Sequence, residues 1–284
     1  MFDPRHVNRR PSLLILLGLV YSSISLLLAY ITFRGHVSVT MVFFTVMALT
    51  PLVYNSIKQD EERDVELPSE TKILAAHAKT IKKFMYIFIG MVLSFSLWFT
   101  VLPLEQSTDI FEAQITTINR INAPAATGEL TGKVVAERFP FLAKIMLNNT
   151  IVLIFCVLFS LLFGFGALFI LSWNASVIGA AIGSIFREGF FMASEMSGIA
   201  RHYSYFQIIS YGLMRFAVHG IPEIMGYFVA GLSGGILCFA VIRHDINSKN
   251  FRKIFYDSLD LLFISVLLIV FAAVIEVYVS PFIF

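Results

Sequence analysis

The chain has 284 residues, of which 57% are hydrophobic and only 14% are charged, and its formal net charge is +2. About a quarter of the residues of a soluble globular domain are charged, so this composition excludes a soluble domain and indicates an integral membrane protein. The lipid bilayer is therefore its main partner, and no nucleic-acid partner is expected.

The first predicted elements are two membrane-spanning helices over residues 12–33 and 37–57. Each run is long enough to cross a hydrocarbon core of about 30 Å, which takes roughly 20 residues in a helix. Arg5, Arg9 and Arg10 precede the first run as in a signal peptide. That run is long and lacks a convincing cleavage site, so we interpret it as a retained anchor. Residues 1–57 thus form an N-terminal transmembrane helix pair.

Residues 58–83 form a hydrophilic connection with six basic and six acidic side chains. We interpret it as a solvated cytoplasmic connection, and a docking site for a cytosolic partner is the alternative. Everything after it, residues 84–284, is predicted to be one membrane domain. Within this domain, residues 105–146 form an external segment that is too small for a catalytic domain.

The predicted fold class is all-α, a polytopic transmembrane helix bundle with about seven spans. The five spans of the membrane domain are expected at residues 84–104, 147–171, 175–193, 222–242 and 259–279. Residues 207–220 are apolar but too short to cross, because a helix rises only about 1.5 Å per residue. We expect a short re-entrant or interfacial helix there.

The distribution of Lys and Arg predicts the orientation of the protein in the cell membrane. Three lie before Pro11, six between Lys58 and Lys83, and four between Arg243 and Lys253. Cytoplasmic segments are enriched in these residues. The prediction is a multi-pass protein with a cytoplasmic N-terminus and an external C-terminus.

The most unusual stretch is Arg215–Glu223, which places titratable side chains inside an apolar run. A centrally placed Arg or acidic residue costs roughly 2.5–3.5 kcal/mol on insertion scales, so Arg215 and Glu223 require compensation. His219 lies between them, and Glu276 in the last span could lie at similar depth. We predict that Arg215, His219, Glu223 and Glu276 form an intramembrane polar network.

The same stretch carries a predicted helix break at Gly220 and Pro222. Pro222 lacks a backbone donor and disfavours helical geometry before it, and Gly220 could adopt the left-handed conformation that ends a helix. Charged His219 and Glu223 would then lie at favourable helix ends. If the helix is continuous instead, Arg215, His219 and Glu223 share one face at four-residue steps.

Three readings of this network remain open. It can be an ion-pair and hydrogen-bond lock that holds the bundle, or a transport or proton-relay site. It can also be the start of a metal site, with further ligands from Glu188, Glu195, His202 or Glu276. No spacing demands such a set, so we predict no metal, no cofactor and no catalytic residues.

Small residues recur within the predicted spans at spacings that align them on helix faces. Such faces let helix backbones approach closely in a membrane. We expect packing within one chain, with a homodimer as the alternative. The predicted packing glycines are Gly164, Gly166, Gly179, Gly183, Gly231 and Gly235.

Polar residues at predicted span boundaries are interpreted as caps or turns, namely Asn148, Asn149 and Asn174. Cys156 and Cys238 lie within predicted spans without metal-ligand spacing. We interpret both as small core residues.

Three motifs in order give the chain a family resemblance. Asn148-Asn149 opens a span that leads to Asn174 and Gly179/Gly183, His219-Gly220-Ile221-Pro222-Glu223 precedes Gly231, and Ile275-Glu276 leads to Ser280-Pro281. Together they resemble the stage II sporulation protein M family of integral membrane proteins, over roughly residues 84–281. The N-terminal helix pair and the connection after it depart from the shorter sporulation members.

The resemblance implies a role as a scaffold. The sporulation protein helps to localise peptidoglycan-degrading enzymes during engulfment of the forespore. Our leading hypothesis is a non-enzymatic membrane protein that assembles or positions cell-envelope or membrane-remodelling partners. The alternatives are a small permease or flippase that uses the stretch around His219 and Glu223, and an intramembrane metalloenzyme.

Overall fold

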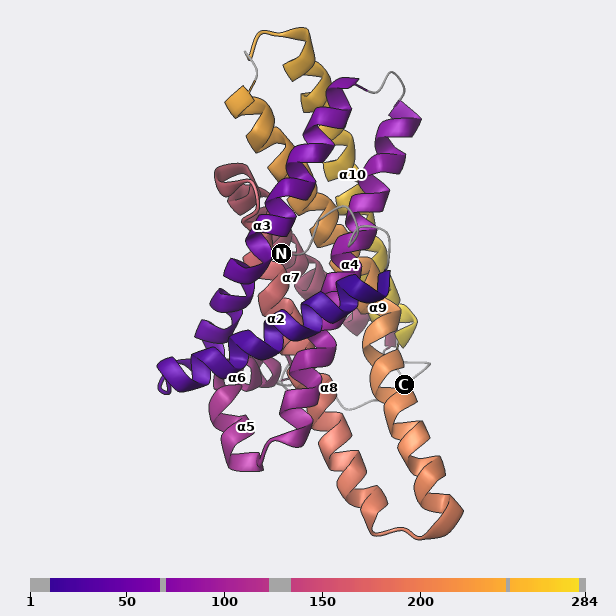
Figure 1. Cartoon of the computed structure of the whole chain (residues 1–284). Coiled ribbons are helices and arrows are strands. Elements are labelled where there is room, and N and C mark those ends of the chain that lie inside the picture. Colours follow the sequence, from indigo (N-terminus) through magenta and orange to yellow (C-terminus); the bar gives the residue numbers. More distant parts are fainter. Residues whose placement is uncertain (1–10, 67–69, 123–133, 244–245, 281–284) are drawn as a thin grey trace.

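The computed structural model describes residues 11–66, 70–122, 134–243 and 246–280, and every element among them is an α-helix. Figure 1 shows long helices bundled side by side, with α2 lying obliquely across them. The elements are α2 (Pro11–Thr32), α3 (Val37–Glu66), α4 (Glu70–Val101), α5 (Leu104–Ile110), α6 (Glu112–Asn122), α7 (Val134–Phe163), α8 (Ala167–Ser194), α9 (Gly198–Arg243) and α10 (Lys249–Tyr278).

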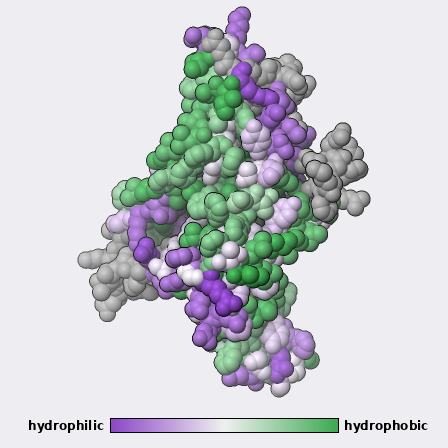
Figure 2. All heavy atoms as spheres, turned by 60° about the vertical axis from the view of Figure 1, so that its left-hand side comes forward, coloured by the Kyte–Doolittle hydropathy of each residue, from purple (hydrophilic) through white to green (hydrophobic). Residues whose placement is uncertain are grey.

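Seven of the described helices are long and apolar enough to cross a membrane. They are α2, α3, α4, α7, α8, α9 and α10. Figure 2 shows a broad hydrophobic surface over the middle of the molecule, with hydrophilic residues gathered toward its two ends. The predicted fold class, an all-α polytopic bundle with seven spans, is confirmed.

The predicted boundary between the fourth and fifth spans is wrong. Instead of spans at 147–171 and 175–193, α7 ends at Phe163 and α8 begins at Ala167. Gly164 adopts a left-handed φ of 75°, which ends the helix, and its amide donates to the Ser160 carbonyl. The Ser160 hydroxyl accepts from the Ala167 amide at 3.0 Å. Gly164 and Gly166 therefore form a turn, because glycine tolerates a conformation that other residues avoid.

The three asparagines predicted as caps or turns lie inside helices instead. Asn148 and Asn149 are inside α7, and Asn174 is inside α8, where its amide donates to the Ile170 carbonyl at 2.8 Å. These asparagines are thus interior helix residues. An Asn in an apolar helix can satisfy its amide on a carbonyl one turn earlier, so its presence does not fix a helix end.

The predicted helix break at Gly220 and Pro222 is wrong as well. α9 continues without interruption through both residues, so 207–220 and 222–242 are parts of one helix. Gly220 is not among the described glycines with positive φ, which are Gly164 and Gly198. Pro222 removes one backbone donor, and α9 packs against α7, α8 and α10, which hold the helix together around that gap.

The hydrophilic connection is largely helical. α3 and α4 extend beyond their apolar parts to Glu66 and from Glu70, and their extensions pack together. Asp60 and His77 are buried between them, with the His77 Nδ1 atom 3.6 Å from Asp60 Oδ2. Thr80 donates to the same carboxylate at 3.0 Å. The two extensions form a paired helical stalk at the top of Figure 1.

The segment after α4 folds back onto the bundle. The predicted external segment, residues 105–146, begins with the short helices α5 and α6, and both Phe111 between them and Gln114 of α6 are fully buried. The Gln114 amide donates to the Ser38 carbonyl and the Ser176 hydroxyl, each at 3.0 Å. α5 and α6 are therefore part of the bundle rather than surface helices.

Candidate functional site

The candidate site is a polar cluster between α9 and α10. On α9, His219, Glu223 and Tyr227 follow one another at four-residue steps, and the Tyr227 hydroxyl donates to Glu223 Oε1 at 2.8 Å. Just after the end of α10, the Ser280 hydroxyl lies 3.4 Å from His219 Nδ1. Glu276 lies one turn before Ser280 and is close enough to Glu223 for their charges to interact.

Continuity of α9 creates this cluster. Residues four apart on an unbroken helix are neighbours, so Tyr227 reaches Glu223 within α9, while His219, one turn earlier, lies beside Ser280. Glu276 lies in the last turn of α10, and Ser280 follows the end of that helix. The continuous helix, the alternative to the predicted break, is the geometry that the structure adopts.

Charge repulsion between carboxylates and hydrogen bonding both act in this cluster. Two ionised carboxylates close together repel strongly where water is scarce. Tyr227 supplies a donor to Glu223, and the ring of His219 can donate or accept according to its tautomer. The side chain of Arg215 lies outside the described residues, so its place in the predicted network stays a prediction.

Asn149 is a polar residue that sequence reasoning had placed at a helix cap. It lies in α7, and only 3% of its surface is exposed. No described group accepts a hydrogen bond from its side-chain amide nitrogen. α7 and α9 run in the same direction, and Ser160 of α7 lies beside Gly234 of α9. Eleven residues earlier on both helices are Asn149 and Glu223, so the packing register sets Asn149 at the depth of the cluster.

Tyr227 and Arg187 are further residues that the sequence reading missed. Tyr227 could have been found from its position one turn after Glu223. Arg187 of α8 donates to the Phe99 and Leu102 carbonyls at the end of α4, and to the Ser107 hydroxyl of α5. A cation at the carbonyl end of a helix is favoured by the helix dipole.

Four of the six predicted packing glycines lie at close helix crossings within the chain, whereas Gly164 and Gly166 lie in the turn between α7 and α8. A Cβ added at Gly179 would come within 2.6 Å of the Phe95 Cβ, and one at Gly183 within 2.7 Å of the Phe99 Cβ. These glycines let α8 approach α4. Gly231 faces Ala167, and Gly235 faces the turn at Gly164, so α9 approaches the α7 and α8 junction in the same way.

Gly18 and Gly90 make an equivalent crossing between α2 and α4 that was not predicted. Each faces the backbone of the other helix. Beside them, the Ser23 and Ser94 hydroxyls lie 2.9 Å apart, and the Trp98 indole donates to Ser23 at 3.0 Å. Glycine and serine one turn apart in both helices were the available sequence signal.

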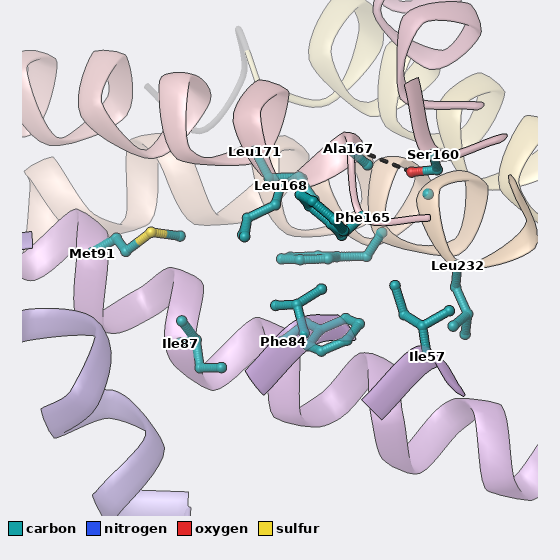
Figure 3. Close-up of a pocket in the computed structure, with 13 residues that line it drawn as sticks. Ile57, Phe84, Ile87, Met91, Ser160, Phe165, Ala167, Leu168, Leu171 and Leu232 are labelled. Carbon is teal, nitrogen blue, oxygen red and sulfur yellow. Dashed lines mark hydrogen bonds between the residues drawn. The ribbon is translucent and has the colours of Figure 1, made fainter. Parts of the chain in front are cut away.

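The interior of the bundle contains an apolar cavity of about 30 Å³ (Figure 3). Side chains from α3, α4, α7, α8 and α9 line it, and its labelled polar atom, the Ser160 hydroxyl, is occupied by the Ala167 amide. Apolar cavities of this size stay dry. None of the polar cluster residues lines this cavity.

No three described His, Cys, Asp or Glu side chains come together in a group that could hold a metal ion. Glu188, Glu195 and His202 belong to the hairpin formed by the end of α8 and the start of α9. His219, Glu223 and Glu276 meet in the cluster between α9 and α10. The candidates named for a metal site are therefore divided between two places.

The fold and the cluster define a polytopic α-helical membrane protein whose polar residues link two neighbouring spans. A family model described as stage II sporulation protein M matches residues 85–281. The chain belongs to this family, as the resemblance implied, and α2, α3 and the first part of α4 precede the matched region. Neither the search of curated proteins nor that of solved structures gave a match.

Proposed function

We propose that this protein is a non-enzymatic membrane scaffold that positions cell-envelope or membrane-remodelling partners. The observation that carries the proposal is the exposed face of α8 at the tip of the α8–α9 hairpin. Glu188, Phe191, Met192 and Glu195 lie on this face at helical spacing, and all four are exposed. The hairpin projects from the lower end of the bundle in Figure 1.

The chemistry of this face suits a protein partner. Phe191 and Met192 are 69% and 66% exposed, and aromatic residues and Met are enriched in the centres of protein interfaces. Glu188 and Glu195 flank them along the helix. The partner that fits is a protein with an apolar contact surface bordered by basic side chains, since acidic flanks favour a basic border.

The polar cluster supports the same proposal. It joins α9 to α10 through contacts within the chain, as a lock between spans would. Such a lock stabilises the base from which the hairpin extends. Family membership agrees, since the sporulation protein acts as a scaffold for envelope enzymes.

A photo-crosslinking amino acid at Met192, introduced into the full chain in native membranes, tests this proposal. We expect a discrete protein adduct that disappears when Glu188 and Glu195 are both replaced by Lys. The matched control carries the crosslinker at Phe263, which is 64% exposed in the apolar part of α10. No discrete adduct from Met192, or the same adducts from Phe263, would contradict the proposed role.

A further inference from the structure

α9 is much longer than a membrane requires. Its 46 residues span about 69 Å as a helix, whereas the hydrocarbon core is about 30 Å thick. Within its C-terminal half, the stretch from Gly226 to Leu237 is almost continuously buried. The excess length is therefore at the N-terminal end, which projects beside α8 as the second arm of the hairpin (Figure 1).

The projecting part of α9 carries an exposed stripe with coiled-coil spacing, which we call the α9 seam. Its residues are Ile199, Tyr203, Phe206, Ser210 and Leu213, separated by steps of four, three, four and three. The four large members are exposed by 89%, 62%, 70% and 43% in chain order. Alternating steps of three and four define the contact line of a two-stranded coiled coil.

The seam faces away from the other arm of the hairpin. Contacts with α8 are made by Tyr205, which meets Phe190 edge to face, by Ile208, which packs on Gly189, and by Gly212 beside Phe186. Ile208 lies two residues from both Phe206 and Ser210, which places it on the opposite side of the helix. α8 therefore leaves the seam uncovered.

The seam continues toward the bundle at Ala217 and Gly220. A Cβ added at Gly220 would have nothing within 4 Å, so this side of α9 is open there too. From Ile199 to Gly220 the line is about 32 Å long. Between the seam and α8 lies an open groove of about 560 Å³, to which Tyr203, Phe206 and Ser210 contribute from α9 and Ile185 and Gly189 from α8.

We propose that the α9 seam binds the α9 seam of a second copy of this chain in a parallel, two-stranded coiled coil. Two copies inserted with the same orientation run parallel, so each seam residue meets its own equivalent across a two-fold axis normal to the membrane. This inference concerns a different arm of the hairpin from the proposed partner face on α8 and goes beyond the scaffold role.

Charge and area support a second copy as the occupant. The positions that flank the seam, Ala200, His202, Gln207 and Ile209, contain no Asp, Glu, Lys or Arg, so like charges do not oppose self-association. Two copies of the seam bring together four aromatic rings, those of Tyr203 and Phe206 from each copy. Aromatic side chains bury about 150–250 Å² each, so the exposed parts of these rings contribute roughly 400–700 Å². Ile199 and Leu213 extend this area toward the roughly 1,000 Å² of a specific interface.

Disulfide trapping in native membranes tests the seam directly. Phe206→Cys and Ile199→Cys should each give a covalent dimer under mild oxidation. Phe191→Cys is the matched control, because Phe191 is almost equally exposed but lies on α8. The buried native residues Cys156 and Cys238 should give no dimer in the unsubstituted chain. Absence of a seam dimer, or an equal dimer from Phe191→Cys, would overturn the proposal.

A charge-pair experiment separates a second copy from other occupants. Chains with Phe206→Glu and chains with Phe206→Lys, carrying different tags, should each lose self-association but copurify when expressed together. Failure of the mixed pair to associate would overturn the proposal. In the disulfide experiment, a Phe206→Cys adduct with another protein would also overturn it, as would a thiol buried in lipid without dimers. The Met192 adduct is scored separately, so either proposal can fail alone.

Discussion

At the scale of single residues, two hydrogen-bonded contacts hold the polar side chains of this cluster, one within α9 and one between α9 and the residues that follow α10. Tyr227 donates to Glu223, and Ser280 meets His219. A polar group without a hydrogen-bond partner costs several kcal/mol in hydrocarbon, so the loss of either contact should lower the stability of the protein. The residue scale therefore predicts measurable coupling across this contact.

Tyr227→Phe should lower the free energy of unfolding by roughly 1–3 kcal/mol, because it removes the donor to Glu223 and little volume. The effect should shrink when Glu223 is already replaced by Gln, and a double-mutant cycle of unfolding in detergent measures this coupling. Tyr256→Phe is the control, since Tyr256 is exposed. Equal losses in both backgrounds would mean that the two side chains do not interact.

Arg187→Lys should destabilise the junction between α4 and α8 by roughly 2 kcal/mol. A lysine cannot keep donors on the Phe99 carbonyl, the Leu102 carbonyl and the Ser107 hydroxyl together, whereas the guanidinium of Arg187 does. Thermal unfolding and hydrogen exchange of the last turn of α4 would report the loss. Arg252→Lys, at an exposed position on α10, should change neither quantity.

At the scale of elements, the decisive question is where helices end. Gly164 ends α7 because its φ is 75°, while Gly220, next to a proline, lies inside a continuous helix. The sequence analysis assigned the opposite roles, with Gly164 as a packing glycine inside a span and Gly220 as the end of a helix. Their different roles follow from packing, since α9 is held by neighbours on both sides of Pro222.

Paired alanine substitutions distinguish these two glycines. Gly164→Ala should destabilise the protein by about 1–2 kcal/mol, because a side chain disfavours left-handed geometry. Gly220→Ala should be neutral or stabilising by up to about 1 kcal/mol, because alanine is the better helix former and its Cβ has open space. The free energy of unfolding of both variants tests this difference. A loss of stability in Gly220→Ala would support a helix break at Gly220 instead of a continuous α9.

At the scale of the whole molecule, seven crossings, an odd number, would place the two termini on opposite sides of the membrane. The charge distribution predicts which side each occupies, with Lys58–Lys83 and Arg243–Lys253 in the cytoplasm. The α8–α9 hairpin and the connection between α2 and α3 would then face outward. Both proposed interfaces depend on this orientation, because the hairpin carries them.

Cysteine accessibility in intact cells tests the orientation. Gly35→Cys and Ser197→Cys should react with a membrane-impermeant thiol reagent from outside, because both positions are exposed at outward connections. Asn250→Cys, exposed at the start of α10, should react only after permeabilisation. The reverse pattern would mean that the hairpin faces the cytoplasm.

The sequence by itself determined the all-α class, the seven crossings and the family, because hydropathy and length act locally and the family motifs lie in order along the chain. It also singled out His219, Glu223 and Glu276. Only the tertiary structure decided that α9 is continuous, that Gly164 lies in a turn, and that Arg187 donates to the carbonyls at the end of α4. These features depend on which neighbour supplies a contact or a hydrogen bond, and that information is absent from local propensity.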